Sequence, residues 1–118
     1  MPHLTLEYSQ NLTAKVRAAQ LTQVGHEIMI ASGLFNAADI KTRSYEVTDY
    51  QVGQKGSEGS FIHATARLLA GRTVEQRKAL SDALFDAIGK LFPEQTQVTV
   101  EIVEMDRDTY KKRQPVAA

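Results

Sequence analysis

The sequence predicts an α+β domain, a two-layer α/β fold in which two tandem strand-helix-strand units build one four-stranded sheet with both helices on one face. Three observations support this prediction. Apolar residues alternate in two stretches, at residues 2–8 and 60–69. Each stretch is followed by apolar residues at helical spacing and then by another alternating stretch. The same order therefore occurs twice, with a period of roughly 58 residues.

The first predicted strand is residues 2–8, PHLTLEY, in which Leu4, Leu6 and Tyr8 share one face. Proline fits the first position of a strand, where its missing N–H group is not needed. Pro2 directly follows Met1, so removal of the methionine would make proline the first residue.

The first helix should begin between Thr13 and Ala19 and end near Ala31–Ser32, with Gly33 as the stop signal. Its apolar stripe is Leu21, Val24, Ile28 and Ala31. Residues 40–50 read as the second strand, with Tyr45 and Val47 on one face. The glycine-rich stretch GQKGSEGS at 53–60 lacks the pattern of a phosphate-binding loop, so we expect a flexible turn.

The second unit starts with a strand at 60–69, in which the alternating residues are Ile62, Ala64, Ala66 and Leu68. Thr73 and Gln76 form a capping-box pattern that predicts the start of a helix. The apolar stripe of this helix is Leu80, Leu84, Ala87, Ile88 and Leu91, and Phe92–Pro93 should end it. QVTVEIV at 97–103 is the predicted fourth strand.

We therefore expect a single domain over residues 1–118, with pseudo-repeats at about 2–52 and 60–106 and a polar tail at 107–118. A strand-helix-strand unit of this length allows a right-handed parallel crossover. With both helices on one face, the other face of the sheet is left bare. We expect apolar residues on that face and hence a homo-oligomer in which sheets pack around a common axis.

Composition excludes several classes of protein. Fourteen basic residues balance fourteen acidic ones and the pI is near 6.8, which argues against nucleic acid or an anionic membrane as a partner. There is no cysteine, and the sequence has no apolar run long enough to span a membrane, so we expect a cytoplasmic protein. His3, His26 and His63 show no metal-ligand spacing, and we expect no metal and no cofactor.

Several stretches carry a family resemblance over nearly the whole chain except the tail. They are the Met-Pro start leading into PHLTLEYSQN, the segment SGLF-x-x-x-x-I-K-T-R at 32–43, FIHATARLLAGRTVEQR, and VTVEIVEM. With these stretches the chain resembles the tautomerase superfamily, and within it the 5-carboxymethyl-2-hydroxymuconate isomerases. LAGRTVEQR at 69–77 is the more specific part of the likeness, whereas the Met-Pro start alone is weak.

The resemblance implies a homotrimer of two β-α-β units per chain, a cleaved methionine, and an N-terminal proline that acts as general base. Carried over by position, Pro2 is the base and Arg72 binds substrate, while Lys41 and Arg43 share the remaining cationic position. The family favours arginine where this chain has Lys41. Lysine keeps the charge but loses the planar two-pronged grip on a carboxylate, so the role could instead belong to Arg43.

The chemistry of a free proline supports this implication. An α-amino group has an unperturbed pKa of about 7.7–8.0. Apolar surroundings and nearby cations disfavour its charged form and lower that pKa further, which suits a base near neutral pH. Before cleavage the same nitrogen is a tertiary amide and accepts no proton. We expect a proton shuttle on an unsaturated 2-hydroxy or oxo dicarboxylate of the 5-carboxymethyl-2-hydroxymuconate type.

Other interpretations of these residues stay open. Arg72 could be an exposed residue of the turn before the helix without a role in binding, and Arg43 could pair with a carboxylate such as Glu46. The chain could also be a phenylpyruvate-type tautomerase, a dehalogenase-like relative acting on small acids, or a trimeric binding protein that has lost the reaction.

Overall fold

The computed structural model describes residues 1–116. The chain forms β1 (His3–Ser9), α1 (Ala18–Ala31), β2 (Lys41–Val47), β3 (Phe61–Leu69), α2 (Val74–Gly89) and β4 (Gln97–Met105). Short 3₁₀ turns occur at η1 (Gln10–Leu12), η2 (Ala37–Asp39) and η3 (Gly53–Lys55). Within the described residues, neither α-helix is long and apolar enough to cross a membrane.

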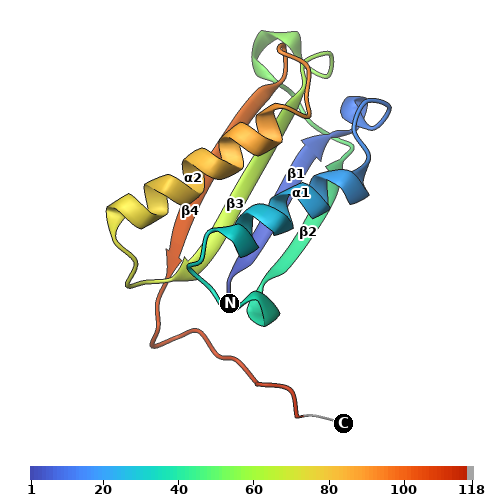
Figure 1. Cartoon of the computed structure of the whole chain (residues 1–118). Coiled ribbons are helices and arrows are strands. Elements are labelled where there is room, and N and C mark those ends of the chain that lie inside the picture. The colour runs from blue at the N-terminus through green and yellow to red at the C-terminus, as the bar shows by residue number, and fades with distance from the viewer. Residues whose placement is uncertain (117–118) are drawn as a thin grey trace.

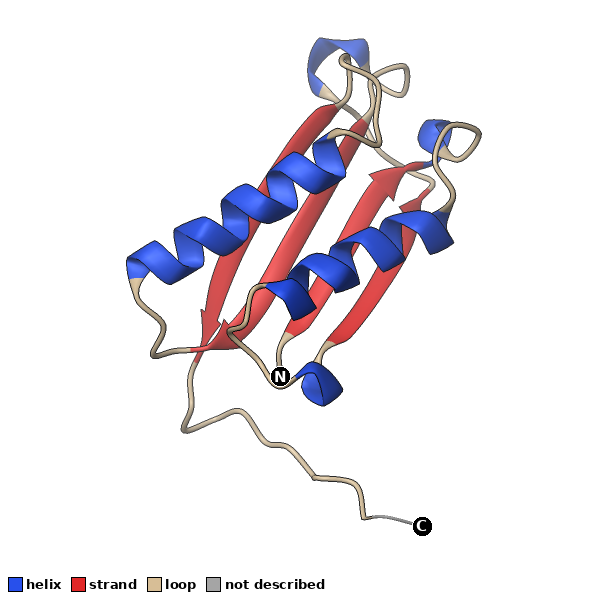
Figure 2. Ribbon diagram, in the orientation of Figure 1, coloured by secondary structure: helices blue, strands red, loops and turns tan. Residues whose placement is uncertain are grey.

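The four strands form one mixed sheet in the order β2-β1-β3-β4. β1 pairs with β2 in parallel, β3 pairs with β4 in parallel, and the two units join through the antiparallel pair β1–β3. Both helices cover the same face of the sheet (Figures 1 and 2). The predicted fold, with its two strand-helix-strand units, is confirmed.

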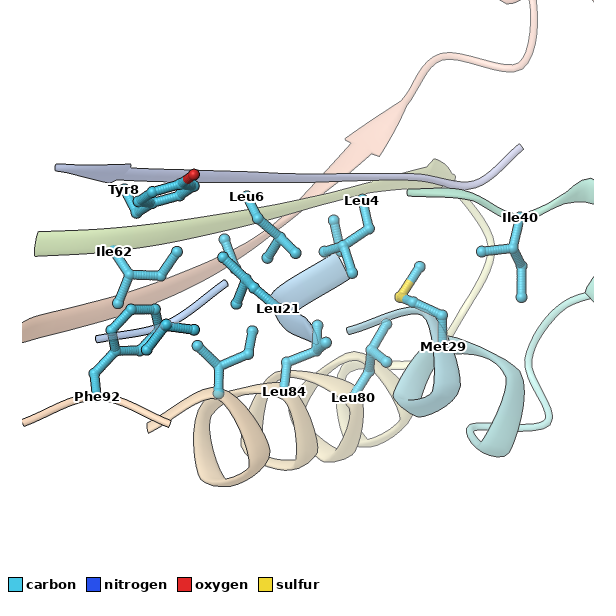
Figure 3. Packing of buried hydrophobic residues seen from close by; sticks show 14 of the residues in the cluster. Leu4, Leu6, Tyr8, Leu21, Met29, Ile40, Ile62, Leu80, Leu84 and Phe92 are labelled. Carbon is cyan, nitrogen blue, oxygen red and sulfur yellow. The ribbon is translucent and has the colours of Figure 1, made fainter. Parts of the chain in front are cut away.

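The core lies between the sheet and the helices. Leu4, Leu6 and Ile62 point from the strands toward Leu80 and Leu84 of α2 (Figure 3), and each of them is at most 2% exposed. The predicted alternation in β3 is also confirmed, because its four even-numbered residues are fully buried. This packing fixes the even-numbered side chains of β1, and Pro2 continues that buried series at the start of the strand.

The helix boundaries follow the capping signals with one difference. Gly33, with a φ of 72°, ends α1 just after Ser32, in the left-handed region that glycine adopts readily. The Thr73 side chain accepts from the Gln76 N–H and the Gln76 side chain accepts from the Thr73 N–H, so the capping box is formed. α2 ends at Gly89, earlier than Phe92–Pro93, because the chain tightens into i→i−3 hydrogen bonds there.

Two strand ends differ from the prediction by more than one residue. β2 ends at Val47, so residues 48–50 lie beyond the strand, and β4 continues to Met105, past residue 103. The extension of β4 follows from its pairing, since Leu69 at the end of β3 still has Met105 as its partner. The longer β4 carries the chain to the end of the sheet where the N-terminus lies (Figure 1).

The sheet face away from the helices corrects one expectation. The register places His3, Lys41 and Arg67 side by side on this face, and Thr5, Arg43 and Glu101 form the next row. These side chains are polar or charged, whereas an apolar face was expected. The alternation that buries apolar residues toward the helices leaves the polar set on the opposite side. The face is therefore mixed and not continuously apolar, since Tyr45 and Val103 lie on it beside the charged residues.

Candidate active site

Three parts of the chain meet at the amino end of β1. His3 pairs with Lys41 at the start of β2 and with Arg67 near the end of β3, so the end of β3 and the start of β2 flank the N-terminus. The Lys41 N–H donates to the Pro2 carbonyl at 3.1 Å. Pro2 is fully buried, and its nitrogen lies in the amide bond with Met1.

A cavity of about 280 Å³ opens at this point, and we call it the N-terminal pocket. Its lining residues are Met1, Asp39, Leu69, Arg107, Tyr110 and Lys112. A larger cavity of about 470 Å³ lies between α1 and α2, but it is lined by apolar residues, Ser32 and Gln76, and holds no titratable side chain. The N-terminal pocket, by contrast, is lined by the titratable side chains of Asp39, Arg107, Tyr110 and Lys112.

Lys41 is the predicted cation that the structure brings to the N-terminus. Its Nζ donates to the Asp39 carbonyl at 2.7 Å. Burial lowers the pKa of the Met1 α-amine, and the Lys41 ammonium lowers it further through its charge and its hydrogen bond. Lys112 adds to this lowering and Asp39 opposes it. An amine at this end of β1 therefore lies in surroundings that favour its uncharged form.

Asp39 ties the C-terminal segment to the pocket. Its carboxylate accepts from Lys112 Nζ at 2.6 Å, with both side chains partly exposed. The hydrogen bond from Lys112 lowers the pKa of the Asp39 carboxyl, which stays ionised at neutral pH. Two ammonium groups, from Lys41 and Lys112, thus flank the N-terminus, and part of their charge is balanced by Asp39.

Arg43 lies one row along the exposed sheet face. Its Nη1 approaches His3 Nδ1 at 3.2 Å. The anticipated pairing of Arg43 with Glu46 is wrong, because side chains at positions 43 and 46 point to opposite faces of β2 and Glu46 accepts instead from the Thr13 hydroxyl. Arg43 therefore reaches the pocket region only through His3.

Arg72 lies in the turn after β3 and is partly buried. Its guanidinium donates to the Leu69 carbonyl at 3.2 Å and to the Leu34 carbonyl at 2.9 Å, and it lies over the Phe35 ring at 5.1 Å from the centroid. Burial and the neighbouring Arg107 lower the pKa of Arg72. These contacts bind the loop after α1 to the loop after β3, so Arg72 has a structural role in joining the two loops.

Sequence reasoning missed the residues that the C-terminal segment contributes. Arg107, Tyr110 and Lys112 belong to the predicted polar tail at 107–118, to which no role in a site was assigned, yet they line the N-terminal pocket. His3 was expected to be structural or solvated, and it contacts Tyr110 at 2.9 Å. Periodicity carries no signal for such contacts, since they join residues 37 to 107 positions apart. Among residues 1–116, no group of three or more His, Asp or Glu side chains forms a metal site.

Comparisons with known proteins find relatives in sequence and in structure. A family model described as 5-carboxymethyl-2-hydroxymuconate isomerase matches residues 2–118. An Escherichia coli protein named 5-carboxymethyl-2-hydroxymuconate Delta-isomerase is 28% identical over 88 residues, covering 75% of this chain and 70% of the relative. A crystal structure of a 5-carboxymethyl-2-hydroxymuconate isomerase from Deinococcus radiodurans R1 superposes with a TM-score of 0.87 at 28% identity, over 97% of this chain and 90% of the other.

A more distant structure shows the same fold. A protein described as a fused 4-OT wild type symmetric trimer has a TM-score of 0.65 at 21% identity, over 86% of this chain and 85% of that chain.

Proposed function

The chain belongs to the 5-carboxymethyl-2-hydroxymuconate isomerase family and is an isomerase with the tautomerase fold, and from that premise we propose that Pro2 is its general base. Met1 is removed, and the freed proline nitrogen moves a proton within an unsaturated 2-hydroxy or oxo dicarboxylate. The observation that carries the proposal is the concentration of cations around the amino end of β1, where burial and Lys41 lower the pKa of an α-amine.

The mechanism needs only this chain's own groups. Removal of Met1 converts the amide nitrogen of Pro2 into a secondary amine with a free electron pair. That pair takes the proton from the substrate's 2-hydroxyl group or from a carbon beside a carbonyl, and the protonated amine then returns a proton to another carbon. The double bonds shift, the amine is regenerated, and the substrate gains and loses no atoms. A base with a pKa near the working pH suits both halves of this shuttle.

Cations stabilise the negative charge that develops on the substrate oxygen during the transfer. We assign this role first to Lys41, whose ammonium lies beside the Met1 α-amine at this end of β1. Arg72 uses two of its five N–H groups on main-chain carbonyls, which leaves donors for a substrate carboxylate. Lysine makes single hydrogen bonds, so Lys41 stabilises the developing oxygen charge as a point charge. Arginine can make paired hydrogen bonds, so Arg72 is better suited to hold a planar carboxylate.

We also propose that the active form is a homotrimer. Support comes from the fold shared with a protein described as a symmetric trimer. The mass of the particle in solution, by light scattering, should be about three times 13.1 kDa, and a 13.1 kDa particle that is fully active would contradict the trimer.

A substrate panel tests the proposed reaction. The protein is first shown by mass spectrometry to begin at Pro2, and it is then assayed with 5-carboxymethyl-2-hydroxymuconate, phenylpyruvate and 3-chloroacrylate. We expect the highest kcat/KM for the dicarboxylate, because Arg107 and Lys112 line the pocket and Lys41 lies beside the N-terminus. Preference for phenylpyruvate or for the chlorinated acid would assign one of the other tautomerase-fold reactions. If none of the three compounds is turned over, the result would favour a binding protein over an enzyme.

A further inference from the structure

A structured turn after β4 delivers Tyr110 to the N-terminal pocket. The Asp106 side chain accepts from the Asp108 N–H at 2.8 Å, and the Asp106 carbonyl accepts from the Tyr110 N–H at 3.1 Å. Arg107 Nε donates to the Ala70 carbonyl at 2.6 Å and fastens this turn to the end of β3. The segment is thus held before Tyr110 by Arg107, and after it by the ion pair of Lys112.

The hydrogen bonds of His3 determine which way its protons point. Arg43 Nη1 lies 3.2 Å from His3 Nδ1, and a guanidinium carries only donors, so Nδ1 must be the unprotonated acceptor. The ring proton of neutral His3 then lies on Nε2, which is 2.9 Å from the Tyr110 hydroxyl oxygen. The two rings meet edge to face, with centroids 6.0 Å apart and planes at 72°.

This arrangement leaves the Tyr110 proton free. The tyrosine oxygen accepts from His3 Nε2–H, so its own O–H is not needed for that contact. Tyr110 and Met1 line the same cavity, which places the Tyr110 side chain close to the residue that precedes Pro2. A neutral hydroxyl donor at this place complements the flanking ammonium groups. The ammonium groups attract an anion through their charge, whereas the hydroxyl makes a directional hydrogen bond to one of its oxygens.

We propose that the Tyr110 hydroxyl donates a hydrogen bond to an oxygen of the bound dicarboxylate, and that Arg43 and His3 are positioning residues that hold it in this orientation. This inference rests on the proposed function for the identity of the substrate. It also gives Arg43 a different role from substrate binding: the guanidinium fixes the tautomer of His3, and His3 orients Tyr110.

The test uses Tyr110→Phe, with Tyr50→Phe as the matched control. Tyr50 packs edge to face on Phe61, beyond the opposite end of β2, and loses one hydroxyl in the same way. We measure kcat/KM for 5-carboxymethyl-2-hydroxymuconate and, by calorimetry, the Kd for the unreactive dicarboxylate cis,cis-muconate. Loss of a hydrogen bond to a charged oxygen should lower kcat/KM and weaken muconate binding by about tenfold or more in Tyr110→Phe. Tyr50→Phe should change neither value by more than about twofold.

The imidazole nitrogen NMR spectrum tests the positioning role without any turnover. Wild-type His3, assigned by comparison with His3→Asn, should carry its proton on Nε2 at neutral pH. In Arg43→Gln the amide can accept as well as donate, so the Nε2–H form should lose its dominance and the kcat/KM should fall toward that of Tyr110→Phe.

Unchanged muconate affinity in Tyr110→Phe, or a proton on His3 Nδ1 in the wild type, would overturn the inference. If the wild type binds muconate through Tyr110 but turns over no substrate, the proposed function fails and the Tyr110 contact stands.

Discussion

Gly25 of α1 lies where the helix comes closest to β1, and replacing it with alanine sets two effects against each other. A Cβ at this position would lie 2.9 Å from Leu4 Cδ2 and 3.2 Å from Leu6 Cδ1. Both leucines are fully buried, so neither side chain moves away without disturbing the core. Overpacking of this kind costs about 1–3 kcal/mol. Replacing a helical glycine by alanine stabilises the helix by about 1 kcal/mol.

Gly25→Ala should therefore lower the free energy of unfolding by up to about 2 kcal/mol, because the gain of about 1 kcal/mol offsets only part of the overpacking cost. Gly89→Ala is the matched control, because it lies at the end of α2 and a Cβ there meets nothing within 4 Å. The control should be neutral or stabilising by up to about 1 kcal/mol.

Thermal unfolding of both variants, at one protein concentration, measures the difference. A domain of this size should show a Tm shift of roughly 3–6 °C for each kcal/mol. Because Leu4 follows Pro2 and His3 on the same strand, a shift of Leu4 would also disturb the N-terminal pocket, and kcat/KM should fall in Gly25→Ala only. A Gly25 variant that is as stable as the Gly89 variant would refute the close packing of α1 on β1.

Three further changes probe other parts of the account. Thr73→Ala removes the capping box of α2 and should lower the free energy of unfolding by about 1 kcal/mol in a denaturant titration, with kcat unchanged. Ser9→Ala deprives the Phe61 N–H of its buried acceptor at 3.0 Å and should cost about 1–3 kcal/mol in the same titration, more than the exposed cap. Lys41→Met removes a charge that lowers the pKa of an amine at the N-terminus. The acid limb of the kcat/KM profile should therefore move to higher pH, with kcat/KM at neutral pH lower by about tenfold or more, whereas Lys41→Arg should keep the wild-type limb.

The elements that local patterns encode could be read from the sequence. Leu4 and Leu6 alternate with polar residues as a half-buried strand requires, and Thr73 with Gln76 starts α2 as the capping box predicts. Gly33 ends α1 because it alone of the nearby residues adopts a positive φ without steric conflict. Such features depend on neighbours within a few positions in the sequence, so they can be predicted without knowledge of tertiary contacts.

The site was only partly readable, because its contacts are distant in sequence. Pro2 and Lys41 lie on elements that periodicity locates, and the register then brings them together. Tyr110 and Lys112 follow the last strand in a polar stretch without a repeat, and only the turn at Asp106 directs them back to the N-terminus. The mixed character of the bare sheet face was visible in the odd-numbered residues of the strands, but the apolar even-numbered set dominated the pattern.

The most direct measurement compares two preparations of the same sequence in one ketonisation assay at neutral pH. One begins at Pro2, and the other retains Met1 because methionine aminopeptidase is inhibited during expression; mass spectrometry defines the fraction of each. The account predicts that activity per mole follows the fraction of chains that begin at Pro2, since the amide nitrogen of the longer form accepts no proton. Equal activity in the two preparations would contradict it and would place the base elsewhere in the pocket.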